Sequence, residues 1–397
     1  MKSKEIIEKY NQFVMHTYAP SAVIATGSGC KVRNPERNTF LDFTSGISVQ
    51  NVGHCHPKVV QAIQDQAAKL THCSNLFINE PATLLAERLS RLSLNGKCFF
   101  CNSGAEANEA MVKLARLWGR EKGKYEIVTM VNSFHGRTLG MIAATGQEKV
   151  QNGFDPLPVG FAYADFNDLE SVKAAINDKT VAVMVEAVQG EGGVVAATEE
   201  FMVGLRQLCD EKGLLLLCDE VQCGLGRTGK WWGWQHYPVR PDAFTVAKSL
   251  ASGLPMGALI ASPALSDVFQ PGHHASTFGG NPVAAAAALA VLDVIEQESL
   301  VSSSEKLGAL FREGLQLFVE KYDQVLEIRG EGMLVGMVME GKAKAVVDKC
   351  REMGLLCCVA GEHVVRFLPP LTVKEDEIEE ALEMIGDALD ELFGDGE

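Results

Sequence analysis

The chain has 397 residues, 47% of them hydrophobic and 22% charged, and its formal net charge at pH 7 is −15. This length allows two or three domains, each with a substantial apolar core. A surface this acidic repels nucleic acid and anionic membranes, so we expect neither as a partner. Anionic small molecules would then have to be attracted by a few local arginines.

The sequence predicts neither a secretory signal nor a membrane span. Charged side chains interrupt the apolar residues of segment 1–14, unlike a secretory signal. No apolar run approaches the about 18 residues that a membrane-spanning helix needs. Cysteines such as Cys209, Cys218 and Cys350 stand singly inside apolar segments. That placement favours reduced thiols and a cytoplasmic location.

Predicted elements are mixed in the first 50 residues and regular afterwards. Residues 1–50 predict one helix and three short strands, at Ala22–Ile24, Cys30–Val32 and Thr39–Phe43. From about 55 to 290, helical patterns alternate with short, continuously apolar runs: Tyr125–Val131, Val181–Val188, Leu214–Val221, Ala243–Val246 and Met256–Ala261. Runs of this length between helices are typical of a parallel sheet with helices on both faces.

The last part of the chain predicts a different arrangement. Its helices are Pro282–Glu298, Leu307–Tyr322, Ala343–Met353 and Glu375–Leu392, and its strands are Met333–Met339 and Val364–Phe367. We therefore predict an α/β protein of two domains. A large domain, residues 55–290, holds a mostly parallel sheet between helices. A smaller α+β domain is built from both chain ends, residues 1–54 and 291–397.

Two short patterns resemble metal sites. Cys98 and Cys101 have CxxC spacing, and His54-Cys55-His56 is dense in ligand atoms. A structural zinc site needs a second pair at suitable spacing, which the CxxC lacks, and its two inner residues are phenylalanines. We predict packing for the cysteines, a turn for the histidines, and no metal site.

The glycine-rich segment Gly224–Lys230 contains both a G-x-G-x-x-G and a G-x4-G-K pattern. Both nucleotide motifs need a helix to begin there, so that its amides face the phosphates. The aromatic segment that follows, 231–238, ends in proline and is a poor helix. Trp231 also stands where a P-loop has Ser or Thr for magnesium. The segment is better interpreted as a loop beside another site, with a nucleotide site as the alternative.

Polar residues follow several of the apolar runs, at strand ends that face the ligand crevice of a parallel sheet. One run ends at Asp219, a position for a fixed carboxylate, and another leads to Glu186. A third is followed by Lys248. Burial lowers the pKa of a lysine and frees its amine to attack carbonyls. A lysine with its ammonium group in solvent is the alternative.

A fourth element begins at Ser103, which fits a helix N-cap with Glu106 three residues later, as in a capping box. An apolar stripe follows from Ala107 to Trp118. Such a helix start binds phosphate well, although a plain capped helix is the alternative. A phosphate cradle, a carboxylate, a buried lysine and an aromatic are together the parts that hold pyridoxal phosphate.

Ordered motifs along nearly the whole chain resemble the class III, or omega-type, aminotransferases. They are Leu41-Asp42-Phe43, Gly53–Pro57, Asn102–Glu109, Ser133–Thr138, Glu186–Gly193, Asp219–Lys230, Ala247-Lys248 and Ser276–Pro282. The resemblance implies the fold of type I pyridoxal-phosphate transferases and a homodimer with the active site shared across its interface. Ala187, Cys223 and Ser249 depart from the usual motifs without removing a functional group.

The resemblance also implies a role for each matched residue around the cofactor. Lys248 binds pyridoxal 5'-phosphate as a Schiff base and carries the proton, while Asp219 keeps the pyridinium nitrogen protonated. Gln222 hydrogen-bonds the ring hydroxyl side, and Phe134 stacks on the ring. The phosphate is held by Ser103, Gly104, Ala105 and, from the neighbouring subunit, Thr277.

For the substrate, the resemblance implies that Ser276 and Arg137 make contacts and that Arg366 binds the α-carboxylate of glutamate. Glu191 matches the gate that pairs with this arginine when an amine without that carboxylate binds. Two guanidinium groups suit the two carboxylates of 2-oxoglutarate. Taken alone, Arg366 could equally be a solvated charge at a strand end.

Within the family, the chain most resembles the acetylornithine group. This implies a ping-pong reaction that moves the terminal amino group of N-acetylornithine to 2-oxoglutarate, giving N-acetylglutamate semialdehyde and glutamate in arginine biosynthesis. Ile47 stands where ornithine enzymes tend to have an aromatic residue. The alternatives are 4-aminobutyrate, ornithine and succinylornithine aminotransferases. Outside the class, they are an amine-shifting pyridoxal-phosphate isomerase and a nucleotide-binding protein.

Overall fold

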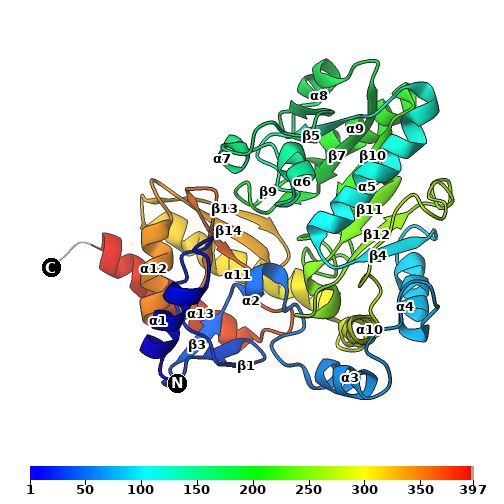
Figure 1. Cartoon of the computed structure of the whole chain (residues 1–397). Coiled ribbons are helices and arrows are strands. Elements are labelled where there is room, and N and C mark those ends of the chain that lie inside the picture. Colours follow the sequence, from blue (N-terminus) through cyan, green and yellow to red (C-terminus); the bar gives the residue numbers. More distant parts are fainter. Residues whose placement is uncertain (395–397) are drawn as a thin grey trace.

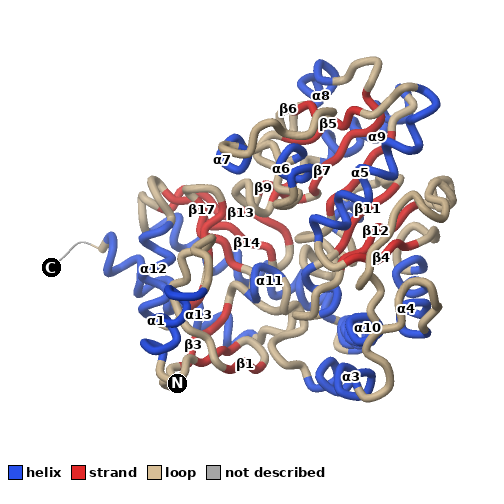
Figure 2. Tube along the Cα trace, viewed as in Figure 1, coloured by secondary structure: helices blue, strands red, loops and turns tan. Residues whose placement is uncertain are grey.

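The computed structural model describes residues 1–394, and its largest element is a seven-stranded sheet (Figures 1 and 2). In order across the sheet, the strands are β4 (Cys98–Cys101), β12 (Gly257–Ala261), β11 (Ala243–Val246), β10 (Leu215–Asp219), β7 (Thr180–Glu186), β5 (Glu126–Met130) and β6 (Phe161–Ala164). Only β12 runs in the direction opposite to the other six strands. The predicted α/β fold with a mostly parallel sheet is therefore confirmed.

Helices cover both faces of this sheet, and every residue of β7 and β10 is therefore buried. Successive side chains point to opposite faces. Ala182 and Met184 belong to the apolar cluster that contains α5 (Gly104–Gly119). Val183 belongs to the cluster that contains α9 (Glu199–Lys212). This two-sided burial explains why the strands read as unbroken apolar runs.

Shorter elements complete this part of the chain. The helices are α3 (Pro57–Ala67), α4 (Glu80–Arg91), α6 (Leu139–Ala144), α7 (Glu148–Gln151), α8 (Leu169–Ala175) and α10 (Pro282–Gln297), and a small hairpin is made by β8 (Val188–Gln189) and β9 (Val195–Ala196). The α10 helix packs against α3 and α4. Its N-terminus is fixed by the Asn281 side chain, which accepts hydrogen bonds from Val283 and Ala284. Single 3-10 turns lie at Arg120–Lys122, Gly233–His236 and Lys248–Ala251.

The chain ends form two four-stranded sheets. The first is built from the C-terminal part alone, and the second combines strands from both ends. One has the order β13 (Val325–Glu331), β14 (Leu334–Met339), β17 (Val364–Phe367) and β16 (Cys358–Ala360), and the other has β1 (Thr26–Ser28), β2 (Lys31–Arg33), β3 (Thr39–Asp42) and β15 (Leu355–Leu356). Their helices are α1 (Ser3–Phe13), α2 (Ser45–Ser48), α11 (Leu300–Lys321), α12 (Lys344–Met353) and α13 (Glu375–Phe393). The parallel pairing of β3 with β15 joins the two ends of the chain.

Some boundaries differ from the sequence prediction. The strand expected at Ala22–Ile24 is wrong, because the first strand begins at Thr26. The strands β6, β13 and β16 were not predicted. Apolar runs identify strands buried on both faces, but most of β13 is only partly buried or exposed. The run expected at Val181–Val188 is also divided, because β7 ends at Glu186 before a separate short strand.

In the two patterns that resembled metal sites, the side chains contact other groups of the protein. His54 Nε2 lies 2.7 Å from Asp42 Oδ2, and the His56 side chain caps α3. Cys98 and Cys101 lie on β4, and each thiol contacts a backbone carbonyl. Residues 1–394 contain no group of three or more histidine, cysteine or acidic side chains placed to hold a metal ion.

The glycine-rich segment Gly224–Lys230 forms turns, and no α-helix begins in it. Arg227 in this segment is fully buried and donates to the Pro369 carbonyl at 2.5 Å and to Ser48 Oγ at 3.0 Å. The segment thus ties the seven-stranded sheet to both chain ends. Over residues 1–394, no helix is long and apolar enough to cross a membrane.

Candidate active site

Three neighbouring strands bring predicted site residues together at one edge of the sheet. Asp219 ends β10 and is in register with Glu186 at the end of β7. On its other side it is in register with Thr245 of β11, three residues before Lys248. Both carboxylates are buried. Burial, and then the nearby Asp219, raise the pKa of Glu186 well above its ordinary value.

The Asp219 carboxylate is held by three donors. Asn108 Nδ2 donates to Oδ2 at 2.7 Å, and His135 Nδ1 lies 2.8 Å from the same oxygen. The Val221 amide donates to Oδ1 at 3.0 Å. Asn108 is fixed in turn, since its Oδ1 accepts from Thr245 Oγ1 at 2.6 Å. Hydrogen bonds to an ionised acceptor are strong, so this carboxylate has one fixed position.

Sequence reasoning did not assign a site role to Asn108 or His135. Asn108 is a buried amide on a helix face otherwise lined by small and apolar residues. It lies one turn after Gly104, on the same side of α5. His135 stands inside the Ser133–Thr138 motif, next to a predicted ring-stacking residue. Its Nε2 atom is buried without a hydrogen-bond partner among the described residues.

Lys248 follows β11 with a backbone φ of +46°, in the left-handed region. A lysine there is strained, and such strain gathers at functional sites. Burial lowers the pKa of Lys248 below its ordinary value, although Glu191 acts in the opposite direction. A larger share of the amine is therefore neutral, and the neutral amine is the nucleophile toward carbonyl groups.

The start of α5 lies beside Asp219. Ser103 Oγ accepts from the Glu106 amide at 3.2 Å, as predicted for an N-cap. The reciprocal contact is shifted by one residue, because Glu106 Oε2 accepts from the Asn102 amide at 2.7 Å. A Cβ on Gly104 would lie 2.7 Å from Val221 Cγ1, so glycine is needed there. The free amides of this helix start suit a phosphate.

Phe134 and Arg137 lie on the loop after β5. The Phe134 amide donates to Glu186 Oε2 at 3.2 Å, which fixes the backbone beside the buried carboxylates. The Arg137 guanidinium lies 5.3 Å from the centre of the Phe134 ring, and Arg137 is exposed. The ring is half-buried, and the guanidinium remains open to a ligand.

A second charged cluster surrounds Arg366 of β17. Its Nη1 donates to Glu191 Oε1 at 2.6 Å, to the Gly190 carbonyl at 2.9 Å and to Gln222 Oε1 at 3.0 Å. Gln222 Nε2 also donates to Glu191 at 3.1 Å. Burial raises the pKa of Glu191, but Arg366 lowers it further, and the result is below the ordinary value. Arg366 is thus a buried cation, not a solvated charge.

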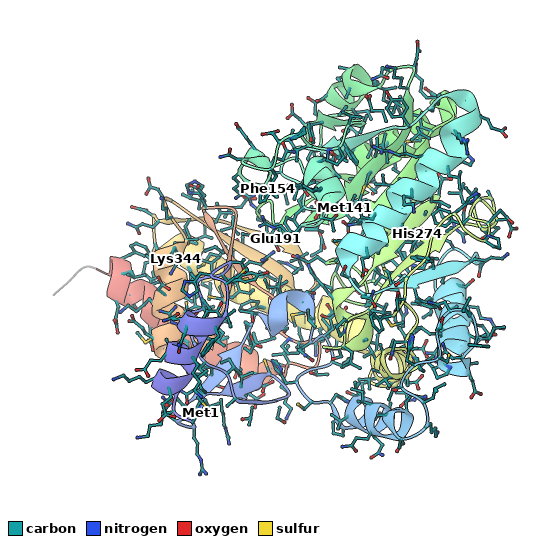
Figure 3. The ribbon with its side chains drawn as sticks, in the orientation of Figure 1. Met1, Met141, Phe154, Glu191, His274 and Lys344 are labelled. Carbon is teal, nitrogen blue, oxygen red and sulfur yellow. The ribbon has the colours of Figure 1, made fainter. Side chains whose placement is uncertain are left out.

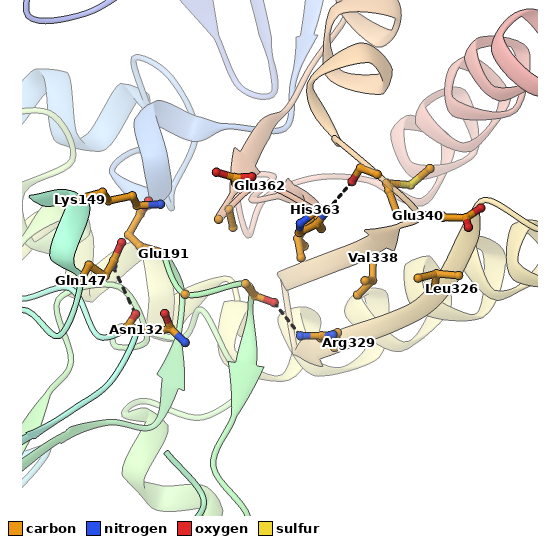
Figure 4. Close-up of a pocket in the computed structure, with 17 residues that line it drawn as sticks. Asn132, Gln147, Lys149, Glu191, Leu326, Arg329, Val338, Glu340, Glu362 and His363 are labelled. Carbon is orange, nitrogen blue, oxygen red and sulfur yellow. Dashed lines mark hydrogen bonds between the residues drawn. The ribbon is translucent and has the colours of Figure 1, made fainter. Parts of the chain in front are cut away.

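Glu191 lies between the seven-stranded sheet and the chain-end sheets (Figure 3). Its backbone carbonyl accepts from the Gly361 amide at 3.0 Å. A cavity of about 520 Å³ opens beside it, with Lys149, Arg329 and His363 in its lining (Figure 4). Lys248 does not line this cavity, which is therefore a neighbour of the predicted catalytic residues and not their pocket.

Ser276 and Thr277 lie on the loop between β12 and α10. Ser276 Oγ accepts from the Gly279 amide at 3.0 Å and lies 3.4 Å from Asn102 Nδ2, next to Ser103. Thr277 is exposed. Within residues 1–394, neither side chain makes a hydrogen bond to another predicted site residue. One chain therefore does not by itself explain the role expected for Thr277.

The residues present fit pyridoxal phosphate. Lys248 offers a buried amine, and Asp219 offers a fixed carboxylate at the adjoining strand end. The α5 start offers amides, and Phe134 offers a ring that is half-buried. These are the groups that bind the cofactor's carbonyl, ring nitrogen, phosphate and ring face.

Comparison with known proteins agrees with this fit. Residues 14–389 match the model of the family "Aminotransferase class-III". The chain is 47% identical over 395 residues to the acetylornithine aminotransferase of Caldanaerobacter subterraneus subsp. tengcongensis, covering 98% of both chains. It is similar to an ornithine aminotransferase structure from Toxoplasma gondii, described with partial occupancy of PLP at the active site (TM-score 0.93, 33% identity, 97% and 93% coverage). It is also similar to the acetylornithine aminotransferase structure from Elizabethkingia anophelis (TM-score 0.87, 33% identity, 98% and 100% coverage).

Proposed function

The chain belongs to the class-III aminotransferase family, and from this membership we propose that its substrates are N-acetylornithine and 2-oxoglutarate. It is a pyridoxal-phosphate-dependent aminotransferase, like the other members of the family. The terminal amino group of N-acetylornithine is transferred, which gives N-acetylglutamate semialdehyde and glutamate. The single observation behind this choice of donor is the 47% identity to an acetylornithine aminotransferase over nearly the whole of both chains.

Pyridoxal phosphate, when bound, supplies an electron sink for the carbanion formed at the amine-bearing carbon. In the proposed mechanism, the Lys248 amine holds the cofactor and then moves the proton at that carbon. Asp219 would pair with the ring nitrogen, and Gln222 would bond the ring hydroxyl side. Phe134 would stack on the ring. Ser103, Gly104, Ala105 and the partner subunit's Thr277 would hold the phosphate at the α5 start.

Arg366 and Glu191 allow one site to accept two unlike substrates. We propose that Arg366 binds the α-carboxylate of glutamate, while Arg137 and Ser276 contact the rest of the substrate. When the donor has no carboxylate at that position, Glu191 stays on Arg366 at the observed 2.6 Å. The gate then prevents an unpaired buried cation, which would be costly.

The same proposal includes a homodimer. Leu76, Phe77 and Ile78 are 85%, 68% and 92% exposed, and Phe278 beside Thr277 is 60% exposed. Neighbouring exposed apolar residues of this kind are typical of an interface, which supports the proposed dimer. A second copy covering it supplies Thr277 to the neighbouring phosphate site. Native mass spectrometry tests the dimer, and a Thr277→Ala variant should bind the cofactor more weakly without dissociating.

We further propose that residues 55–290 form a cofactor-binding domain, and that residues 1–54 and 291–397 form a second domain that carries Arg366. Residues 395–397 of this second domain lie outside the part of the chain that the structure describes. The location proposed is cytoplasmic. All 11 cysteines are free thiols, as a reducing compartment requires. Separate expression of segment 55–290, followed by a thermal melt, tests whether this segment folds independently.

The first experiment compares kcat/KM for N-acetylornithine, ornithine and 4-aminobutyrate, each with 2-oxoglutarate. We expect N-acetylornithine to lead by more than about tenfold, or ~1.4 kcal/mol of transition-state preference. A lead by ornithine or 4-aminobutyrate would overturn the proposed donor and leave the family chemistry intact. Arg137→Ala serves as the site control, because it should weaken substrate binding far more than cofactor binding.

A further inference from the structure

Arg366 has a neighbour that the proposed mechanism does not use. Cys358 of β16 is in register with Arg366 of β17, so the two side chains share one face of the sheet. Arg366 Nε lies 3.4 Å from Cys358 Sγ. The other polar contacts of this guanidinium, to Glu191, Gly190 and Gln222, all involve Nη1.

The two edges of the guanidinium are therefore held by different parts of the chain. Glu191, one of the acceptors on Nη1, has a side chain that is 28% exposed. The Arg366 side chain is only 1% exposed, so Glu191 is the partner that can move away. When Glu191 leaves, Nη1 and Nη2 can receive a carboxylate as a two-pronged fork. The sulfur stays on the adjacent strand and still contacts Nε. Cysteine sulfur is a weak hydrogen-bond acceptor, so it leaves the cation free to bind the carboxylate.

We propose that Cys358 is a positioning residue that holds Arg366 for carboxylate recognition, and that its sulfur is a modification site for small electrophiles that carry a carboxylate. The proposal rests on the proposed role of Arg366 in binding the glutamate carboxylate. Cys358 is partly exposed, whereas the adjacent Cys357 is buried and contacts Cys350. Of this pair, only Cys358 is therefore accessible to a reagent.

Iodoacetate is the simplest reagent of this class. The positive charge of Arg366 attracts its carboxylate, which raises the concentration of the reagent beside the sulfur. The deprotonated sulfur attacks that carbon, a C–S bond forms, the C–I bond breaks and iodide leaves. The thiol proton goes to solvent. Iodoacetamide undergoes the same substitution but lacks the anionic group, so the guanidinium does not concentrate it.

The test labels the holoenzyme in parallel with iodoacetate and iodoacetamide and measures each cysteine by peptide mass spectrometry. Cys55 is the internal reference, because it is exposed and its neighbours His54 and His56 are paired with acidic residues. We expect the iodoacetate-to-iodoacetamide ratio to be at least about fivefold higher at Cys358 than at Cys55, as charge attraction near a buried cation predicts. Glutarate and the Arg366→Gln variant should each remove the excess. Equal ratios at the two cysteines would overturn the proposal.

Kinetics test the positioning role separately. Cys358→Ala should raise KM for glutamate about three- to tenfold with kcat unchanged, because it loosens a group that binds the ground state. Cys358→Ser keeps an acceptor for Nε and should lie closer to the wild type. KM for the amine donor should not change, since Glu191 holds Arg366 in that half-reaction. An equal rise in both KM values would assign Cys358 a merely structural role.

These outcomes distinguish the inference from the proposed function. If Arg366→Gln loses the glutamate half-reaction but Cys358 is labelled no better by iodoacetate, the function stands and the inference fails. If Cys358 is labelled selectively while Arg366→Gln still uses glutamate normally, the carboxylate role of Arg366 is wrong. The positioning role of Cys358 for glutamate then fails with it.

Discussion

The two charged regions of the site are held very differently. The side chain of Asp219 is 4% exposed and has three donors from α5, the loop after β5 and its own turn. The side chain of Glu191 is 28% exposed and, within residues 1–394, is bound only by Arg366 and Gln222. A cofactor that stays in place requires the first kind of environment. A site that alternates between two substrates requires the second.

Replacing Lys248 should have the largest effect on the fixed region. Lys248→Ala removes the side chain proposed to bind the cofactor covalently and to carry the proton, so kcat should fall by about 10⁴-fold or more. The absorbance of the bound cofactor should also move away from that of the lysine-linked form. Lys113→Ala, on the exposed side of α5, is the control and should retain activity. Full activity without Lys248 would contradict the assignment of the catalytic amine.

Asp219→Asn should follow. In either orientation, its amide NH2 faces a donor, because Asn108 and His135 bond one oxygen and the Val221 amide bonds the other. We expect kcat to fall about 10²–10³-fold, as for loss of a preorganised charge, and the free energy of unfolding to fall by about 1–3 kcal/mol. Stopped-flow kinetics and urea denaturation measure the two effects.

Asp242→Asn is a matched control for that variant. Asp242 lies just before β11, at the opposite end of the strands, and accepts from Arg206 at 2.9 Å and from the Leu216 amide at 2.8 Å. The same isosteric change there should reduce stability but leave kcat nearly unchanged. If both variants lose activity equally, the fixed carboxylate acts through folding alone.

The contrast between the two regions also limits what the sequence could predict. Lys248 and Asp219 follow strands buried on both faces, whose unbroken apolar runs locate their own ends. Asn108 and His135 act through contacts across 111 and 84 residues of chain, which no local pattern contains. Cys358 lies on β16, a three-residue strand that was not predicted. Its contact with Arg366 depends on the register of the two strands and appears only in the folded chain.

Arg366→Lys changes the region around Glu191. We expect its effect to be milder than the effects of replacing Lys248 or Asp219. Lysine keeps the charge but cannot bind a carboxylate with two parallel N–H groups. KM for glutamate should rise about 10- to 100-fold, with a smaller effect on the amine donor. Arg329→Lys is the control, because Arg329 lies on β13 of the same sheet but lines the cavity beside Glu191. Equal losses for both substrates would mean that Arg366 does not distinguish the two half-reactions.

Glu191→Gln should have the smallest effect, and it tests whether the two regions communicate through charge. Burial lowers the pKa of Lys248, Glu191 raises it and Arg366 lowers it. Glu191→Gln removes the negative charge that raises the Lys248 pKa. It also leaves the charge of Arg366 unpaired, and this cation lowers the Lys248 pKa further. The neutral amine then appears at lower pH. The rate at which apoenzyme captures pyridoxal phosphate, measured against pH, should therefore rise at a lower pH than in the wild type.

The control is Glu340→Gln. Glu340 lines the cavity beside Glu191, and its replacement should leave the pH profile unchanged. An unshifted profile for Glu191→Gln would mean that the gate and the catalytic amine are electrostatically independent. The gate would then control only which substrate binds.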